Sequence, residues 1–262
     1  MSQKVVIPAR NREIVEVQPA SVMEQYIESA KAYNSEKARE TLGVGNDRVS
    51  VTRDEFAGSS PFINILLANL DSDNPGVFPN KQTPVTRDVL ERATFYDPAF
   101  LKGHFSDFGL ALVTPTDTYK PNNLLAKRLA EQLEKRKIEL GTGKLIHFNA
   151  FSKPIEHDNS AYGLVLDLKD DFSKDNLLDS GLIRDLSGFS WDYNRGEGLS
   201  RAYFYYDRDW SCNDRVLDYS DSNGRVVGVG VECTQSLVSG TIEDRVKKAL
   251  ENTGFKGAID LF

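Results

Sequence analysis

The sequence predicts an α/β protein of the mixed, α+β kind, on the basis of three observations. Apolar residues recur at helical spacing over residues 22–33 and 125–133. After Gly143 they form short runs or alternate with polar residues, which is typical of strands. The chain of 262 residues is 40% hydrophobic and 27% charged, as in ordinary globular proteins, and it is long enough to bury a large core.

The charge balance and the apolar runs exclude several classes of protein. The chain has 32 Lys+Arg against 39 Asp+Glu and a net charge of -7, which argues against a generally basic nucleic-acid binder. No stretch approaches the ~18 apolar residues of a membrane span, and the first residues lack the apolar core of a signal peptide. We therefore expect no nucleic-acid partner and no membrane insertion. A cytoplasmic location is the default, with surface display left open.

The first predicted helix begins at Ser21, which has the spacing of a capping box with Glu24. Its buried face repeats at helical spacing until Gly43 and consists of Val22, Tyr26, Ala30 and Tyr33. Residues 1–43 are therefore expected to form an N-terminal helical segment that packs on a main domain, residues 44–262.

The middle of the chain gives mixed signals. Thr52 and Glu55 have the spacing of another capping box, which predicts a helix start. An apolar run over residues 62–70 precedes a loop at 71–84 that is rich in Asn, Asp, Gly and Pro. A short helix is predicted over residues 86–94.

The second half begins with a helix and continues with strands and loops. A helix is predicted over 122–137, with Leu125, Leu129 and Leu133 on one face. The chain direction then reverses at Gly141 and Gly143. Strands are predicted over 145–148, 162–168, 201–206 and 226–231, and a last amphipathic helix over 241–250.

Two short motifs resemble phosphate and calcium sites but lack required residues. The stretch 141–144 reads Gly-Thr-Gly-Lys, yet Ile138 and Leu145 stand where a phosphate-binding loop needs glycine and Ser or Thr. Asp71, Asp73 and Gly76 resemble the start of a calcium loop. In that loop Pro75 occupies a ligand position and Gln82 replaces the bidentate glutamate.

Other candidate catalytic or metal-binding residues carry little information. Asp167, Asp170 and Asp171 lie beside Lys169 at a strand end, where solvated charge is the ordinary outcome. The histidines lack metal-ligand spacing, and the apolar neighbours of His147 favour a structural role; the three are His104, His147 and His157. No catalytic residue, metal or cofactor is predicted. A Ser/His/Asp triad stays open because its members need not be close in sequence.

The segment 198–231 differs in composition from the rest of the chain. It alternates Tyr and Trp with Asp, Ser and Asn, and it contains no Lys, Glu, Gln or Met. Tyr and Trp supply rigid contact area, whereas Ser, Asn and Asp supply adaptable hydrogen bonds. The segment therefore predicts a recognition surface formed by Tyr203, Tyr205, Tyr206, Asp207, Asp209, Trp210, Ser211, Asn213, Asp214, Asp218, Tyr219, Ser220 and Asp221.

Randomised adenines in asparagine codons would produce this bias. A codon of the form AAC can then become Tyr, Ser, Asp, Cys, Gly, Arg or His, but never Lys, Glu, Gln, Met or Trp. Trp210 would be a fixed or differently encoded anchor.

The stretch Gly198-Leu-Ser-Arg201 … Trp210 … Leu217 … Asn223-Gly-Arg-Val226 resembles the variable region of the target proteins of archaeal diversity-generating retroelements. In that family an error-prone reverse transcriptase copies a template repeat with mutations at adenines, and the copy replaces the variable region of the target gene. The resemblance implies a C-type lectin-like domain with a loop-rich variable face and a variable region at about 198–226. Family variable regions commonly lie near the C-terminus, whereas residues 232–262 follow here.

The resemblance also divides the segment into two sets of residues. The recognition residues named above match varied positions, apart from Trp210. The positions that match the fixed scaffold are Gly198, Arg201, Phe204, Leu217, Gly224, Arg225 and Val226.

The expected function is ligand binding through a diversified surface at about 201–223, without catalysis. The ligand is expected to be a protein or another surface macromolecule, and the acidic face suggests basic or amide-rich partners. One alternative is an enzyme, because the formylglycine-generating family shares the fold and uses cysteines; Cys212 and Cys233 would be the candidates. A calcium-dependent lectin is the other alternative. The oligomeric state is left open.

Overall fold

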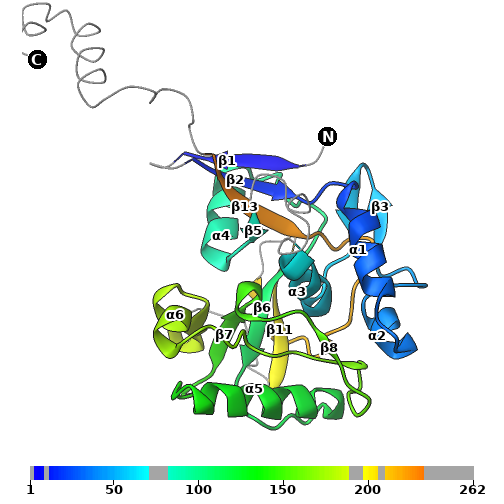
Figure 1. The fold of residues 1–262 in the computed structure, drawn as a ribbon. Coiled ribbons are helices and arrows are strands. Elements are labelled where there is room, and N and C mark those ends of the chain that lie inside the picture. Colours follow the sequence, from blue (N-terminus) through cyan, green and yellow to red (C-terminus); the bar gives the residue numbers. More distant parts are fainter. Residues whose placement is uncertain (1–2, 9–11, 71–81, 189–196, 206–209, 233–262) are drawn as a thin grey trace, which may run out of the picture.

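The computed structural model describes residues 3–8, 12–70, 82–188, 197–205 and 210–232. The described ranges contain helices and several sheets in a mixed arrangement, which confirms the predicted α+β class (Figure 1). The helix predicted over 241–250, the calcium-like residues 71–76 and Cys233 lie outside these ranges. Within them, no helix combines the length and the apolar composition that crossing a membrane requires.

A four-stranded antiparallel sheet joins the two ends of the described chain. Its order is β1 (Lys4–Ile7), β2 (Arg12–Val17), β13 (Val227–Glu232) and β5 (Thr83–Pro84). Val229 of β13 pairs with Val15 of β2. The strand that follows the recognition segment is therefore held by the N-terminal part of the chain.

A five-stranded antiparallel sheet forms the centre of the molecule. Its order is β10 (Ile183–Asp185), β7 (Lys144–His147), β6 (Ser106–Leu112), β11 (Leu199–Phe204) and β12 (Trp210–Ser211). The pairing of β11 with β6 shifts register between Ala202 and Tyr203. Such a bulge bends a strand and changes the direction of its side chains.

Two hydrophobic cores cover the two faces of this sheet. One contains α3 (Pro61–Leu70) and α5 (Asn123–Lys135), and Leu110 of β6 faces it. The other lies toward the four-stranded sheet and α4 (Arg87–Tyr96), and Phe108 of β6 faces it. In Figure 1 the four-stranded sheet and α4 lie at one end of the molecule and α5 at the other.

The N-terminal segment differs from the expected single helix. It contains α1 (Val22–Lys31) and a separate α2 (Glu36–Thr41), and Ser21 makes no side-chain cap whereas Ser35 accepts the N–H of Ala38 at 3.3 Å. Residues 1–43 also include β1 and β2, which the sequence pattern did not predict. Because β2 pairs with β13, this segment shares a sheet with the main domain.

The helix start predicted at Thr52 is wrong. The residues form a hairpin of β3 (Ser50–Thr52) and β4 (Glu55–Ala57). Arg53 and Asp54 take φ values of 54° and 67°, the left-handed pair that two-residue hairpin turns require. Glu55 is buried as a partner of Arg225 instead of capping a helix.

Most other predicted elements are confirmed. The helices at 86–94 and 122–137 are α4 and α5, the latter after a 3-10 turn at Lys120–Asn122. The apolar run 62–70, for which the sequence predicted no element type, is α3. Three of the four predicted strands are β7, β11 and β13. The fourth is reduced to β9 (Leu164–Val165), which pairs with β8 (Ile155–Glu156). The sequence did not predict α6 (Lys174–Asp179) or β6.

Candidate functional site

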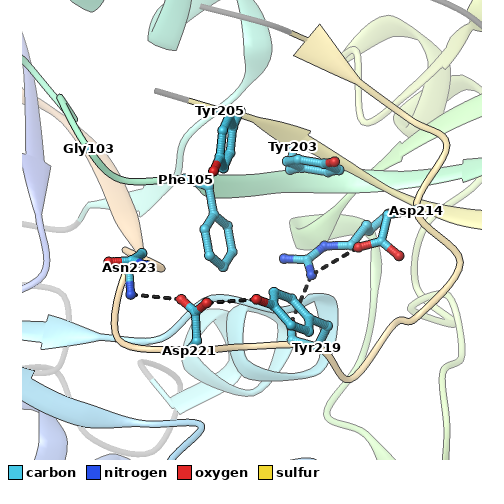
Figure 2. Close-up of a pocket in the computed structure, with 9 residues that line it drawn as sticks. Gly103, Phe105, Tyr203, Tyr205, Asp214, Tyr219, Asp221 and Asn223 are labelled. Carbon is cyan, nitrogen blue, oxygen red and sulfur yellow. Dashed lines mark hydrogen bonds and ion pairs between the residues drawn. The ribbon is translucent and has the colours of Figure 1, made fainter. Parts of the chain in front are cut away.

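A surface pocket lies on the recognition segment, where residues 201–223 meet the chain just before β6. Its volume is about 140 Å³. Its lining, most of which is labelled in Figure 2, comprises Gly103, Phe105, Arg201, Tyr203, Tyr205, Asp214, Tyr219, Asp221 and Asn223.

The floor of the pocket is a buried ion pair between two neighbouring strands. Arg201 of β11 donates from Nε and Nη2 to the two carboxylate oxygens of Asp107 on β6, at 2.7 and 2.6 Å. The side chains are 1% and 0% exposed. Bidentate geometry of this kind gives a strong and directional pair.

Arg201 also fixes two loops beside the pocket. Its Nη1 donates to the carbonyl oxygen of Tyr219 at 2.9 Å, and its Nη2 donates to that of Ser59 at 3.1 Å. Burial, the largest single influence, lowers the pKa of Arg201, but the charge and hydrogen bonds of Asp107 together with the charge of Asp214 outweigh it, and the pKa is raised. The guanidinium therefore remains charged and ties β6, β11 and both loops together.

Three aromatic rings form the walls of the pocket around this guanidinium. The Arg201 Cζ atom lies 5.1 Å from the ring centroid of Phe105, 5.2 Å from that of Tyr203 and 5.7 Å from that of Tyr219. Phe105 packs edge-on against Tyr203 at 6.4 Å between centroids. Cation–π contacts within about 6 Å stabilise such a cluster.

Carboxylates and a tyrosine form the rim. The Tyr219 hydroxyl donates to Asp221 Oδ2 at 2.7 Å, and the backbone N–H of Asn223 donates to Asp221 Oδ1 at 2.8 Å (Figure 2). The hydrogen bond to Asp221 raises the pKa of Tyr219, which keeps the phenol neutral. Asp214 lies 3.6 Å from Arg201 Nη1 and accepts the N–H of Val216 at 2.9 Å.

The scaffold expected from the resemblance supports the pocket from below. All seven of its members are buried: Gly198, Arg201, Phe204, Leu217, Gly224, Arg225 and Val226. Arg225 Nε donates to Glu55 at 3.0 Å, and its backbone N–H donates to the carbonyl of Phe105 at 2.8 Å.

Two of these scaffold glycines lie where no side chain fits. A Cβ on Gly224 would lie 2.5 Å from the backbone nitrogen of Ser59, and one on Gly198 would lie 2.2 Å from Asp117 Cγ. Gly198 also has a φ of 92°, which only glycine adopts without strain. These contacts place the two ends of the recognition segment.

The structure brings five of the predicted recognition residues together at the pocket: Tyr203, Tyr205, Asp214, Tyr219 and Asp221. Ser211 and Asn213 lie nearby on the surface and bond to each other at 2.6 Å. Asp218 pairs with Arg48 at 2.6 Å. Tyr206, Asp207 and Asp209 lie outside the described residues.

Two predicted recognition residues have mainly structural contacts. Ser220 is buried, and its hydroxyl donates to the carbonyl of Arg48 at 2.6 Å and accepts the N–H of Ser59 at 2.9 Å. This corrects its placement on the binding face. Trp210 is half-buried, with ring centroids 4.8 Å from Phe204 and 5.5 Å from Phe108.

The sequence did not identify Gly103 or Phe105 as pocket residues, whereas Asn223 lies at the end of the expected binding surface. Phe105 reaches the site because its N–H donates to the carbonyl of Asn223 at 3.2 Å, within a parallel bridge to Gly224. No local pattern in the sequence predicts this long-range pairing. Arg201 was expected as scaffold, and it serves both as scaffold and as pocket floor.

Three other residues that the sequence analysis considered have structural partners: Asp167, His147 and Lys144. Asp167 accepts Arg128 Nε at 2.5 Å and Gln132 Nε2 at 2.6 Å, and the hydrogen bond from Arg128 lowers its pKa. His147 is buried, as its neighbours suggested, and burial lowers its pKa to about 4. Lys144 pairs with Asp185. In the described part of the chain, no group of three His, Cys, Asp or Glu could hold a metal ion.

The chain finds no match among protein-family models, curated proteins or solved structures.

Proposed function

We propose that this protein binds ligands through the surface formed by residues 201–223, as a C-type lectin-like variable protein of an archaeal diversity-generating retroelement. One observation carries the proposal. The residues expected to be fixed are buried, whereas five of the nine described residues expected to vary line one surface pocket. A binding face of this kind can change its side chains while the core beneath it stays the same.

The exposed aromatic residues support binding as the role of this face. Tyr205 and Tyr219 are 40% and 47% exposed, and both border the pocket. Exposed tyrosines beside carboxylates are effective as anchors, because each ring supplies contact area with few rotatable bonds.

The size of the pocket favours a macromolecular ligand. A volume of about 140 Å³ is well below the ~300–1,000 Å³ of sites that enclose a small molecule. A hollow of this size suits one side chain that projects from a larger partner, with the surrounding surface making further contacts.

The enzyme alternative gains no support from Cys212. This cysteine is 4% exposed and belongs to the hydrophobic core that contains Phe204 and Ala202. Burial of this kind is typical of structural cysteines, whereas reactive ones are partly exposed in electropositive surroundings.

The test is the variation of the gene among close relatives. We expect a near-copy of the DNA encoding residues 198–226, differing at adenines and lying beside a reverse transcriptase gene. Substitutions should concentrate at the codons of Tyr203, Tyr205, Asp214, Tyr219 and Asp221. Absence of the near-copy, or changes that fall equally on the buried scaffold codons, would overturn the proposal.

Ser220 makes the same sequencing test sharper. Its buried hydroxyl makes two internal hydrogen bonds, so we expect its codon to vary less than those of Tyr219 and Asp221 beside it.

A further inference from the structure

We infer that the pocket takes the cationic end of an arginine or lysine side chain presented by a protein ligand. This inference rests on the proposed function and names the ligand chemistry of this particular sequence variant. Three observations support it: the net charge of the pocket lining, the hydrogen bonds that already occupy donors at the pocket floor, and the exposed aromatic rings.

The lining carries a net negative charge. Arg201 is the cation among the described residues that line the pocket, and Asp107 neutralises it through two hydrogen bonds. The charges of Asp214 and Asp221 are then left over at the rim. Because both carboxylates are partly exposed, they attract a cation and repel an anion.

Most hydrogen-bond donors of the pocket floor already have acceptors within the protein, which disfavours an anionic ligand. A guanidinium has five N–H groups. In Arg201 four of these donate to the two oxygens of Asp107 and to the carbonyls of Tyr219 and Ser59, and Nη1 also lies 3.6 Å from the carboxylate of Asp214. The Tyr219 hydroxyl also donates within the protein, to Asp221.

The rim carboxylates keep free accepting capacity. Among contacts with the described residues, each oxygen of Asp221 accepts one hydrogen bond, and Asp214 Oδ2 has a 3.6 Å contact with Arg201. A carboxylate has about four lone-pair sites, so both groups can accept further bonds from an ammonium or guanidinium.

The rings favour the same ligand. Tyr203 is half-buried and Tyr219 is 47% exposed, and both line the hollow together with Tyr205 at its mouth (Figure 2). Aromatic faces attract cations, and their apolar surface packs against the methylene groups of a long basic side chain.

The first experiment is an NMR titration of the full chain with N-acetyl-arginine methylamide and N-acetyl-lysine methylamide. We expect at least one of the two to shift the amide signals of Tyr203, Asp214, Tyr219 and Asp221, with a millimolar Kd. The neutral citrulline analogue, which has the shape of arginine, should bind about tenfold more weakly. Equal binding of citrulline, or shifts confined to other parts of the chain, would overturn the inference.

The second experiment compares matched charge removals. Asp214→Asn and Asp221→Asn should each weaken binding of the arginine probe about threefold to fivefold. Asp185→Asn removes the same charge from another part of the surface, where its carboxylate pairs with Lys144 and does not line the pocket, so the Kd should stay unchanged. An equal loss in all three variants would show a diffuse field instead of a site and would overturn the inference.

The wild-type protein supplies a measurement that needs no variant. Raising the salt concentration from about 50 to 500 mM should weaken the arginine probe severalfold, because ions screen the rim carboxylates. A Kd that does not change with the salt concentration would overturn the inference.

Failure here is distinguishable from failure of the proposed function. If the gene varies at the expected codons but the basic probes do not bind, the cation site falls and the variable-protein proposal stands. If the probes bind at the pocket but no near-copy of residues 198–226 exists, the cation site stands and the retroelement proposal falls.

Discussion

Single residues of one chemical type have different roles in this segment. Arg201 is a fully buried residue that holds four parts of the chain, whereas Arg48 forms a half-exposed ion pair with Asp218. Composition counts both as one positive charge. The difference matters for stability, because breaking a buried pair leaves an uncompensated charge away from water whereas exposed pairs contribute little.

Asp107→Asn should therefore destabilise the fold strongly. We expect a loss of about 3–5 kcal/mol in the free energy of unfolding, measured by urea denaturation, because Arg201 would stay buried without its counter-charge. The matched control is Asp218→Asn, which should cost less than about 1 kcal/mol. Similar losses in the two variants would contradict the role given to Arg201.

At the scale of elements, β6 and β7 show how tertiary contacts hold the central sheet. All seven residues of β6 are buried because cores lie on both of its faces. On β7, His147 connects the two sheets, since its Nε2 lies 3.1 Å from the carbonyl oxygen of Pro84 on β5. Its Nδ1 accepts the N–H of Asn149 at 3.2 Å, so Nε2 carries the proton and donates.

This histidine should make the fold sensitive to acid. Its pKa is lowered by burial from 6.5 to about 4 in the folded protein. The unfolded chain therefore binds more protons between these values, and stability falls as the pH is lowered through that window, by up to about 3 kcal/mol. Unfolding free energies at pH 7 and pH 4 measure the effect.

His147→Gln is the control for this pH dependence. Glutamine can donate to the same carbonyl but does not titrate, so the variant should lose less stability than the wild type between pH 7 and pH 4. The comparison isolates His147 from acidic residues such as Asp167, whose pKa is lowered as well. An identical pH dependence in the two proteins would rule out this role.

At the scale of the whole molecule, stability and recognition use different residues of the same segment. The scaffold side chains of 198–226 belong to the packed interior, and the β13 strand that follows joins the four-stranded sheet. The rim side chains face outward from this support. Recognition can therefore change without loss of the fold.

The double variant Tyr205→Ser/Tyr219→Ser tests this separation. The two tyrosines are 40% and 47% exposed and belong to neither hydrophobic core, so the free energy of unfolding should change by less than about 1 kcal/mol. Leu217→Ala, a change within the same segment at a side chain that is 0% exposed, should cost about 2–5 kcal/mol. Thermal and urea denaturation provide the measurement. A large loss in the double variant would mean that the tyrosines are core residues.

The helix α5, which has one buried face, could be predicted from the sequence, whereas the strand β6, which is buried throughout, could not. The stripe of Leu125, Leu129 and Leu133 indicated α5 because its other face meets solvent. In β6 the strand is buried throughout, so no alternation of polar and apolar residues marks it. The spacing of Thr52 and Glu55 fits a capping box, but the buried bond from Arg225 to Glu55 stabilises a hairpin.

The sequence by itself determined the α+β class, the main helices and the segment whose composition suits recognition. These depend on local periodicity and residue type, which are readable along the chain. Only the tertiary structure decided that Phe105 joins the pocket, that Ser220 is buried and that Arg201 forms the floor. The physical reason is that pairing between strands far apart in sequence determines which side chains meet and which reach water. The local sequence pattern does not predict that pairing.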